Sequence, residues 1–156
     1  MTIPLDQIYQ EVILDHNRKP RNFRAVPDAT HTSHGYNPLC GDDYRLYLKV
    51  GPSGKVDDAA FEGTGCAISK ASASILTQMV KGKDVAAAED LKNRFVSLVT
   101  RDCVSEVKDP QILGSLVAFE GVRRFPIRVK CATLIWHTLE DALKSGKPAD
   151  TTNGHH

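Results

Sequence analysis

The chain has 156 residues, the length of one ordinary globular domain, and this is enough to bury a hydrophobic core without disulfides. Hydrophobic residues make up 41% and charged residues 25% of the sequence, both typical of a soluble globular protein. The 20 basic and 19 acidic side chains leave a net charge of +1, which gives no reason to expect binding to nucleic acid or to a membrane surface.

The N-terminal sequence shows no sign of export or of membrane insertion. Residues Met1–Asp6 lack the basic region and the apolar run of a signal peptide. The uncharged, largely apolar stretch Ala71–Val80 is too short to cross a bilayer. We therefore expect a cytoplasmic location, where thiols stay reduced. The four cysteines are then predicted to be metal ligands, nucleophiles or core residues rather than disulfide partners.

The first half of the chain predicts one helix followed by a small antiparallel sheet. Apolar residues recur at helical spacing over Leu5–His16. Alternating residues over Tyr44–Val50 predict a strand, the turn residues Gly51–Gly54 follow, and Val56–Phe61 is predicted to be the returning strand of a hairpin. Residues His31–Tyr36 are expected to add a third strand.

The second half of the chain is rich in helix-forming residues. One helix is predicted over Cys66–Lys81, and a second is predicted from a capping aspartate over Asp84–Val99. A short helix is predicted over Asp109–Val117. An extended segment around a proline, Arg123–Val129, is then predicted to lead into the last helix, Cys131–Ser145.

The order helix, sheet, helices predicts the fold class and the extent of the domain. It favours an α+β fold in which a small antiparallel three-stranded sheet packs against helices. We expect this domain to cover residues 1–146 and a disordered tail to cover residues 147–156. No role is assigned to His155 and His156 at the end of that tail.

Three of the four cysteines lie at junctions between the predicted elements. Cys40 precedes the first hairpin strand, while Cys66 and Cys131 are each predicted to open a helix. Unpaired N–H groups and the helix dipole at such a position stabilise a thiolate, which is the form that binds metals and attacks sulfur. Arg128 and Lys130 are expected to add positive charge beside Cys131.

An aspartate accompanies the first of these cysteines. Residues two apart in an extended chain project to one side, so the Cys40 sulfur and the Asp42 carboxylate can share a target, while Asp43 is expected to face solvent. Together with Cys66 and Cys131 they form a set of three thiolates and one carboxylate that suits tetrahedral zinc. On spacing alone, buried cysteines in the core are an equally good interpretation, because the sequence has no Cys-x-x-Cys pair.

Three segments together identify a family. Asn37–Asp42, Gly63–Ser69 and Phe125–Cys131 resemble, in order, the three cysteine motifs of the IscU/NifU N-terminal iron–sulfur cluster assembly family. The predicted first helix and the residues after it, Leu5–Pro20, are also similar to that family. The resemblance extends over residues 5–145, nearly the whole predicted domain.

Two features are similar to the SufU branch of this family. Lys130 stands where IscU proteins have a histidine that can bind metal, and the chain carries extra sequence around Arg101–Leu116 that IscU proteins lack. Cys103 lies in this extra segment and matches none of the motifs. We therefore expect Cys103 to be structural or merely tolerated.

The resemblance implies a site and a reaction. It implies a zinc ion on Cys40, Asp42, Cys66 and Cys131, a persulfide on Cys40, and a supporting role for Arg128. It also implies a cysteine desulfurase of SufS type as partner. We therefore predict a zinc-dependent, sulfurtransferase-type acceptor that takes persulfide sulfur from the desulfurase and supplies a downstream cluster scaffold.

Two alternatives use the same ligands. In the first, they hold iron or a transient iron–sulfur cluster that is built on this protein and handed on; Lys130 in place of histidine argues against it. In the second, the zinc is purely structural. Four other residues that attract attention are predicted to have ordinary roles: His16 at a helix end, His34 in a strand or loop, His137 on the surface, and Trp136 in the core or an interface.

Overall fold

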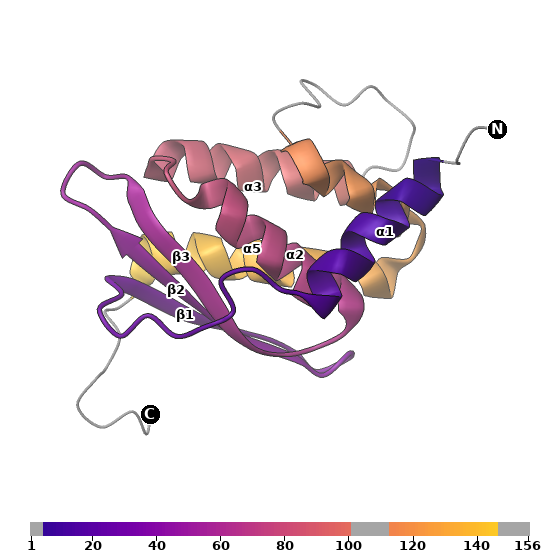
Figure 1. Ribbon diagram of the computed structural model, residues 1–156, viewed down its shortest axis with the longest axis horizontal. Coiled ribbons are helices and arrows are strands. Elements are labelled where there is room, and N and C mark those ends of the chain that lie inside the picture. Colours follow the sequence, from indigo (N-terminus) through magenta and orange to yellow (C-terminus); the bar gives the residue numbers. More distant parts are fainter. Residues whose placement is uncertain (1–4, 101–112, 147–156) are drawn as a thin grey trace.

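The computed structural model describes residues 5–100 and 113–146, with side chains from residue 10 onward. Its elements are helix α1 (Leu5–Arg18), strands β1 (His31–Asn37), β2 (Asp42–Val50) and β3 (Val56–Thr64), helices α2 (Ala67–Val80) and α3 (Val85–Thr100), the 3-10 helix η1 (Gly114–Arg124) and helix α5 (Pro126–Ser145). The strands form an antiparallel sheet in the order β1-β2-β3, and α2 and α5 pack against it (Figure 1). The predicted α+β class is confirmed. Cys103, most of the extra segment and the predicted tail lie outside the described residues.

The register of the sheet determines where its two ends lie. Asn37 at the end of β1 pairs with Asp42 at the start of β2, and Asp43 pairs with Thr64 at the end of β3. These residues therefore meet at one end of the sheet. At the opposite end, the turn between β2 and β3 reaches the start of α3, where Val85 donates its backbone N–H to Gly54.

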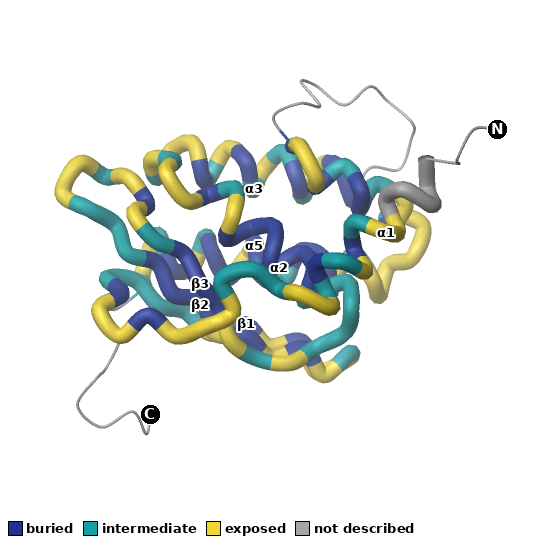
Figure 2. Tube along the Cα trace, in the orientation of Figure 1, coloured by how far each residue is buried: buried dark blue, intermediate teal, exposed yellow. Residues whose placement is uncertain are grey.

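The two faces of the sheet are covered differently. On β2, Tyr44, Leu46 and Leu48 are buried on the side of the helices, as the alternating sequence predicts. On the other face, the segment between α1 and β1 crosses the strands (Figure 2). Its Val26 packs with Tyr47. This segment thus covers part of the second face, although its sequence is polar and irregular, while His34, Asp43 and Arg45 on that face stay exposed.

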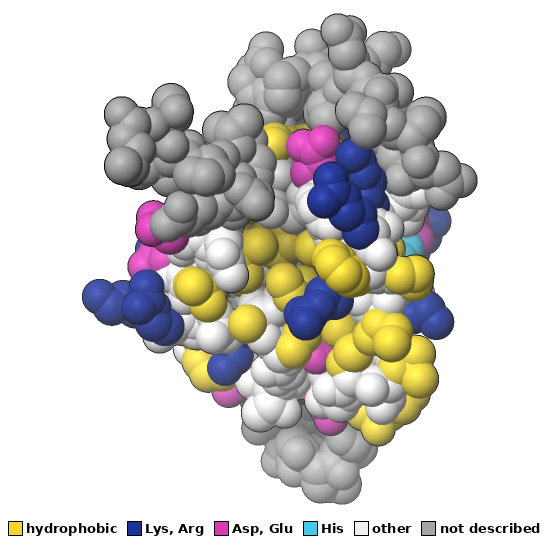
Figure 3. Space-filling view, turned by 90° about the vertical axis from the view of Figure 1, so that its right-hand side faces the viewer, with side chains coloured by type: hydrophobic (Ala, Val, Ile, Leu, Met, Phe, Trp, Pro, Cys, Tyr) yellow, Lys and Arg dark blue, Asp and Glu magenta, His cyan; other side chains and the backbone are white. Residues whose placement is uncertain are grey.

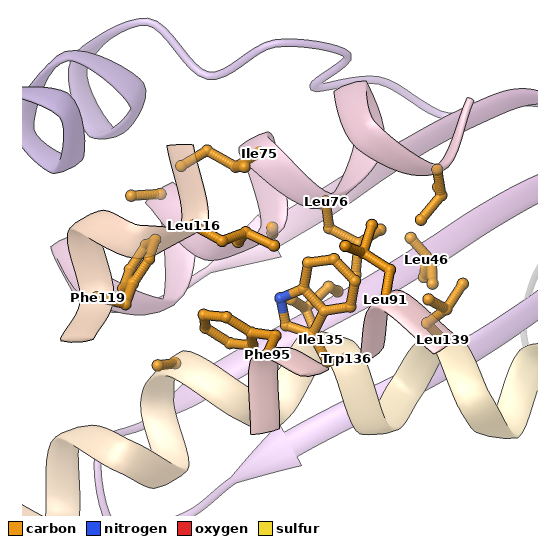
Figure 4. Packing of buried hydrophobic residues seen from close by; sticks show 14 of the residues in the cluster. Leu46, Ile75, Leu76, Leu91, Phe95, Leu116, Phe119, Ile135, Trp136 and Leu139 are labelled. Atoms are coloured by element: carbon orange, nitrogen blue, oxygen red, sulfur yellow. The ribbon is translucent and has the colours of Figure 1, made fainter. Parts of the chain in front are cut away.

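An aromatic cluster forms the centre of the helical layer. Trp136 is fully buried and its ring centroid lies 5.3 Å from that of Phe95, which in turn lies 5.6 Å from that of Phe119 (Figure 4). The indole N–H of Trp136 donates to Ser72 Oγ, 3.1 Å away, and Ser72 donates to the Ala132 carbonyl at 2.6 Å. This satisfies the polar atoms that burial would otherwise leave unpaired. The prediction of a core position for Trp136 is confirmed.

The predictions that Cys66 opens α2 and that Asp84 caps α3 are confirmed, and Cys66 proves to cap its helix as well. Cys66 is the N-cap of α2, and its Sγ accepts the Ser69 N–H at 3.4 Å. Asp84 precedes α3 and accepts the Ala87 N–H at 2.7 Å. In both helices a side chain satisfies a backbone donor that the first turn leaves free.

The start of α5 differs from the prediction. The sequence led us to expect an extended segment over Arg123–Val129, but η1 continues to Arg124 and α5 begins at Pro126. A proline suits the first position of a helix because its fixed φ is helical and its missing N–H would have no partner there. Phe125, the residue before it, is extended, as a residue before proline should be. The predicted short helix over Asp109–Val117 is helical where the structure describes it: residue 113 is helical and residues 114–117 belong to the 3-10 helix η1, which runs beyond the predicted end, while residues 109–112 lie outside the described part.

His16 joins the end of α1 to the middle of α2. Its ring Nδ1 lies 2.7 Å from Ser74 Oγ, which also accepts the Arg21 N–H at 2.8 Å. The prediction that His16 is a helix-end residue is confirmed, although its side chain is buried. Within the described residues, no helix is both long enough and apolar enough to cross a lipid bilayer.

The buried imidazole of His16 should make stability depend on pH. Burial lowers its pKa below the usual value of 6.5, and the nearby charge of Arg21 acts in the same direction. The unfolded chain then binds the proton more readily, so this contribution to stability is complete above the unfolded pKa and is lost as the pH falls below it. We expect the free energy of unfolding to drop more steeply from about pH 7.5 to about pH 5.5 in the wild type than in His16→Gln. Parallel urea titrations measure both slopes, and equal slopes would refute the assignment.

A candidate metal and thiol site at one end of the sheet

Three separate segments bring thiols to the end of the sheet where β2 begins. Cys40 lies in the turn between β1 and β2, Cys66 lies between β3 and α2, and Cys131 lies in α5. These three cysteines line one cavity of about 500 Å³, together with residues of the η1–α5 junction. Residues far apart in the sequence thus form one site.

The turn that carries Cys40 is short and partly exposed. Its Gly41 has φ +72°, a left-handed conformation that glycine adopts without strain. Cys40 itself is half-buried, and its N–H donates to the Asn37 carbonyl at 3.3 Å. Cys40 and Asp42 were expected to share a target because of strand alternation. They do converge, but a turn rather than an extended segment brings them together.

Cys131 occupies a different position from the predicted one. Because α5 begins at Pro126, Cys131 lies in the second turn of the helix and not at its free N-terminus. It is buried, with its sulfur 3.0 Å from Cys40 Sγ. Burial raises the pKa of the Cys131 thiol, and contacts with Cys40 and Asp42 raise it further. The expectation that a helix N-terminus stabilises a thiolate at Cys131 is therefore wrong.

Asp42 is the most enclosed member of the site. Its carboxylate is fully buried, and its Oδ1 accepts the Cys66 N–H at 3.0 Å and the Ser69 hydroxyl at 3.0 Å. Its Oδ2 lies 3.5 Å from Asn37 Nδ2, and the carboxylate also contacts the Cys131 thiol. None of the ion pairs formed among the described residues includes Asp42.

The chemistry of these groups fits a bound cation. Ligand atoms of Cys40, Asp42 and Cys131 all lie within 4.8 Å of one another. A buried carboxylate beside thiolates is unfavourable unless a positive charge compensates it. Three soft thiolates with one carboxylate are a donor set that zinc accepts. Cys66 lines the same cavity but is not part of this close group, so the structure brings together three of the four predicted ligands.

The other predicted residues lie around this group. Arg128 is exposed on α5 and lines the cavity, with no hydrogen bond to Asp42. Asp43 points away from the cysteines and pairs with His34 on the exposed side of the sheet, so both are ordinary strand residues. His137 is exposed on α5, as predicted.

Three residues at the site were not anticipated from the sequence. Ser69 and Asn37 contact the Asp42 carboxylate, and the hydroxyl of Tyr44 lies 2.9 Å from Ser69 Oγ. Two of the three could have been found from the sequence. Ser69 follows the capping Cys66 by three residues, which places it beside the cap in the first turn. Tyr44 follows Asp42 by two residues in a strand and therefore shares its face of the sheet.

Comparison with known proteins places the chain in a family. Residues 8–132 match the NifU-like N terminal domain. The chain belongs to this family. It is 43% identical over 136 residues to the zinc-dependent sulfurtransferase SufU of Bacillus subtilis, an alignment that covers 87% of this chain and 89% of that protein. The predicted resemblance to the SufU branch of the NifU-like family is confirmed.

Other members of the family carry different names. The iron–sulfur cluster assembly scaffold protein IscU of Streptococcus pyogenes is 36% identical over 90% of this chain and 85% of its own length. Among solved structures, a candidate iron–sulfur cluster assembly scaffold for the SUF system from Fervidobacterium islandicum superposes with a TM-score of 0.79. It is 33% identical, and the match covers 90% of this chain and all of that one.

Proposed function

We propose that this protein is a zinc-dependent sulfur acceptor that takes persulfide sulfur from a cysteine desulfurase of SufS type for iron–sulfur cluster assembly. The observation that carries the proposal is the close group of Cys40, Asp42 and Cys131 at a cavity that Cys66 also lines. The similarity to a relative named as a zinc-dependent sulfurtransferase supports it. A cytoplasmic setting, in which thiols stay reduced, suits this chemistry.

Cys40 is the residue best placed to receive sulfur. Its thiolate attacks the outer sulfur of the desulfurase persulfide, a new S–S bond forms at Cys40, and the bond between the two desulfurase sulfurs breaks. The desulfurase cysteine leaves as a thiolate, so no external oxidant or reductant is needed. Among the three cysteines of the cavity, only Cys40 lies in a turn, where its side chain can move without disturbing a helix.

We assign the metal to Cys40, Asp42, Cys66 and Cys131. When bound there, zinc supplies a redox-inert charge that holds thiolates and tolerates exchange of one ligand. Asp42, Cys66 and Cys131 are each fixed by backbone or burial, so they can retain the metal while Cys40 reacts. Arg128 at the cavity is placed to attract the incoming or departing thiolate.

The surface beside the cavity suits a partner that must bring a persulfide to Cys40. Leu39, Phe125 and Ile127 are 67%, 55% and 60% exposed, and with Arg124 and Arg128 they form what we call the docking face. Figure 3 shows this end of the molecule, where apolar side chains gather around Lys and Arg side chains. Neither arginine forms an ion pair among the described residues. We therefore expect the desulfurase to present apolar side chains flanked by carboxylates.

A charge at the centre of the docking face should weaken this encounter. We expect Ile127→Glu to raise the concentration needed for half-maximal stimulation of the desulfurase roughly 10-fold, the change for about 1.4 kcal/mol of interface energy. The maximal rate and the zinc content should stay close to wild type. Ala86→Glu, an exposed change on α3 at the other end of the sheet, is the matched control. If the two variants behave alike, the desulfurase docks elsewhere.

The alternative is a scaffold that holds a transient iron–sulfur cluster on the same ligands. Relatives named as IscU scaffolds favour it, and three thiolates with a carboxylate would make such a cluster labile. Protein purified without a metal-affinity column separates the two functions. A colourless sample with one zinc per chain that accelerates cysteine turnover by the desulfurase supports the acceptor. A brown, iron-loaded sample without that acceleration supports the scaffold.

A further inference from the structure

A chain of buried hydroxyl groups from β2 and α2 reaches the Asp42 carboxylate. The Tyr44 hydroxyl lies 2.9 Å from Ser69 Oγ, and Ser69 donates to Asp42 Oδ1 at 3.0 Å. Tyr44 and Ser69 are each only 1% exposed, so water does not compete for these contacts. A buried hydroxyl group without a hydrogen-bond partner destabilises the fold. The need to satisfy each group therefore holds these three side chains in one arrangement.

The direction of the hydrogen bonds follows from the charge of the carboxylate. Ser69 has one hydroxyl proton and three nearby acceptors, Asp42 Oδ1 at 3.0 Å, the Cys66 carbonyl at 3.1 Å and the more distant Cys66 Sγ at 3.6 Å. The ionised carboxylate is the stronger acceptor, so the proton points toward Asp42. The Tyr44 hydroxyl then donates to Ser69 Oγ. In this relay of two hydrogen bonds, Tyr44 donates to Ser69 and Ser69 donates to Asp42 Oδ1.

Both strong donors converge on the same carboxylate oxygen. Oδ1 accepts Ser69 and the Cys66 N–H, each at 3.0 Å, whereas Oδ2 lies 3.5 Å from Asn37 Nδ2, on a carboxylate that also contacts the Cys131 thiol. The space around Oδ1 is also closed by Gly65, where an added Cβ would lie within 2.7 Å of Asp42 Oδ1, Ser69 Oγ and Tyr44 Oη. Oδ1 is thus occupied, and Oδ2 is the oxygen left for a ligand bond.

We propose that Ser69, supported by Tyr44, is a positioning residue that holds Asp42 Oδ1 and thereby restricts the carboxylate to one metal-binding oxygen, Oδ2. A carboxylate fixed in this way binds as a single ligand and preserves four-coordination with the three thiolates. This inference rests on the metal-binding function proposed above. It assigns Ser69 and Tyr44 a role in tuning the site, not in the transfer of sulfur itself.

The test is a comparison of Ser69→Ala with Ser72→Ala. Both remove one buried hydroxyl from α2, but Ser72 contacts Trp136 and the Ala132 carbonyl rather than the site. Outer partners of metal ligands typically change affinity by about 10- to 100-fold, so Ser69→Ala should weaken zinc by about 10-fold or more in competition with a chromophoric chelator. Ser72→Ala should bind zinc as the wild type does. Loaded with cobalt(II), Ser69→Ala should also show weaker visible absorption, as a five-coordinate ion does.

A double mutant tests whether Ser69 changes zinc affinity through its contact with Asp42. In an Asp42→Ala background, Ser69→Ala should change the zinc affinity by less than about 2-fold, because the group through which it acts is gone. A merely structural serine would weaken binding equally in both backgrounds, and that result would overturn the inference. So would a Ser69→Ala protein with wild-type zinc affinity and cobalt spectrum.

Two further outcomes separate this inference from the proposed function. If Ser69→Ala does not fold, Tyr44→Phe decides: it should weaken zinc in the same direction, and unchanged affinity would overturn the relay. If the wild type binds zinc and Ser69→Ala weakens it, yet the desulfurase is not stimulated, the sulfur-acceptor function fails and the positioning role stands. If the wild type binds no zinc, both fail.

Discussion

Replacing Cys40 with serine is expected to reduce cysteine turnover in the mixture to the rate of the desulfurase alone. A hydroxyl does not replace a thiolate as the nucleophile that takes the outer persulfide sulfur. The variant should remain folded, because the aromatic core around Trp136 is built from helices that do not depend on the Cys40 turn. Alanine release measured at several acceptor concentrations gives the rate.

Cys103→Ser is the control for this prediction. Cys103 matches no motif and should leave the stimulation nearly unchanged. Circular dichroism of both variants shows whether the fold is retained. An unfolded Cys40→Ser protein would favour the purely structural zinc instead, since a ligand that holds the fold together cannot be removed without losing the binding energy that folds the domain.

Removal of zinc is expected to lower stability substantially while leaving the protein folded. At a zinc concentration about 1,000-fold above the dissociation constant, binding contributes about 4 kcal/mol to the free energy of unfolding. For a domain of this size that corresponds to a fall in the thermal midpoint of about 8–16 °C on chelation. The physical cause is the buried Asp42 carboxylate beside thiolates, which loses its compensating charge.

The specificity of the zinc effect can be tested with the same protein. Adding one equivalent of zinc back should restore both the midpoint and the stimulation of the desulfurase, while magnesium, a hard ion that prefers oxygen ligands, should restore neither. A midpoint that does not move on chelation would mean that these residues do not hold zinc in the folded protein.

Much of the fold could be predicted because its signals are local. Alternation over Tyr44–Val50, the glycine turn after it and the caps at Cys66 and Asp84 each depend on a few neighbouring residues. The start of α5 could not be predicted in the same way. A proline favours an extended conformation for the residue before it and also suits the first position of a helix. Our prediction applied the first preference to the residues after the proline as well, and so placed the helix start too late.

The close group of Cys40, Asp42 and Cys131 could be predicted as candidate ligands from the sequence, but the groups that support it could not. Cys40, Asp42 and Cys131 were identified from motifs, and the structure places their ligand atoms together. The contact of Ser69 with Asp42 joins α2 to β2, residues 27 positions apart, so it depends on how the helix docks on the sheet. For the same reason the sequence could not show that Cys131 is buried.

Mapping of the persulfide by mass spectrometry tests the central claim most directly. The zinc-loaded protein is incubated with a SufS-type desulfurase and cysteine, alkylated, and digested without reductant, so that the extra sulfur stays on the residue that received it. We predict an added sulfur mass on the peptide that contains Cys40 and none on the peptides that contain Cys66, Cys103 or Cys131. Persulfide found mainly on one of those three cysteines, or on none of the four, would contradict the account.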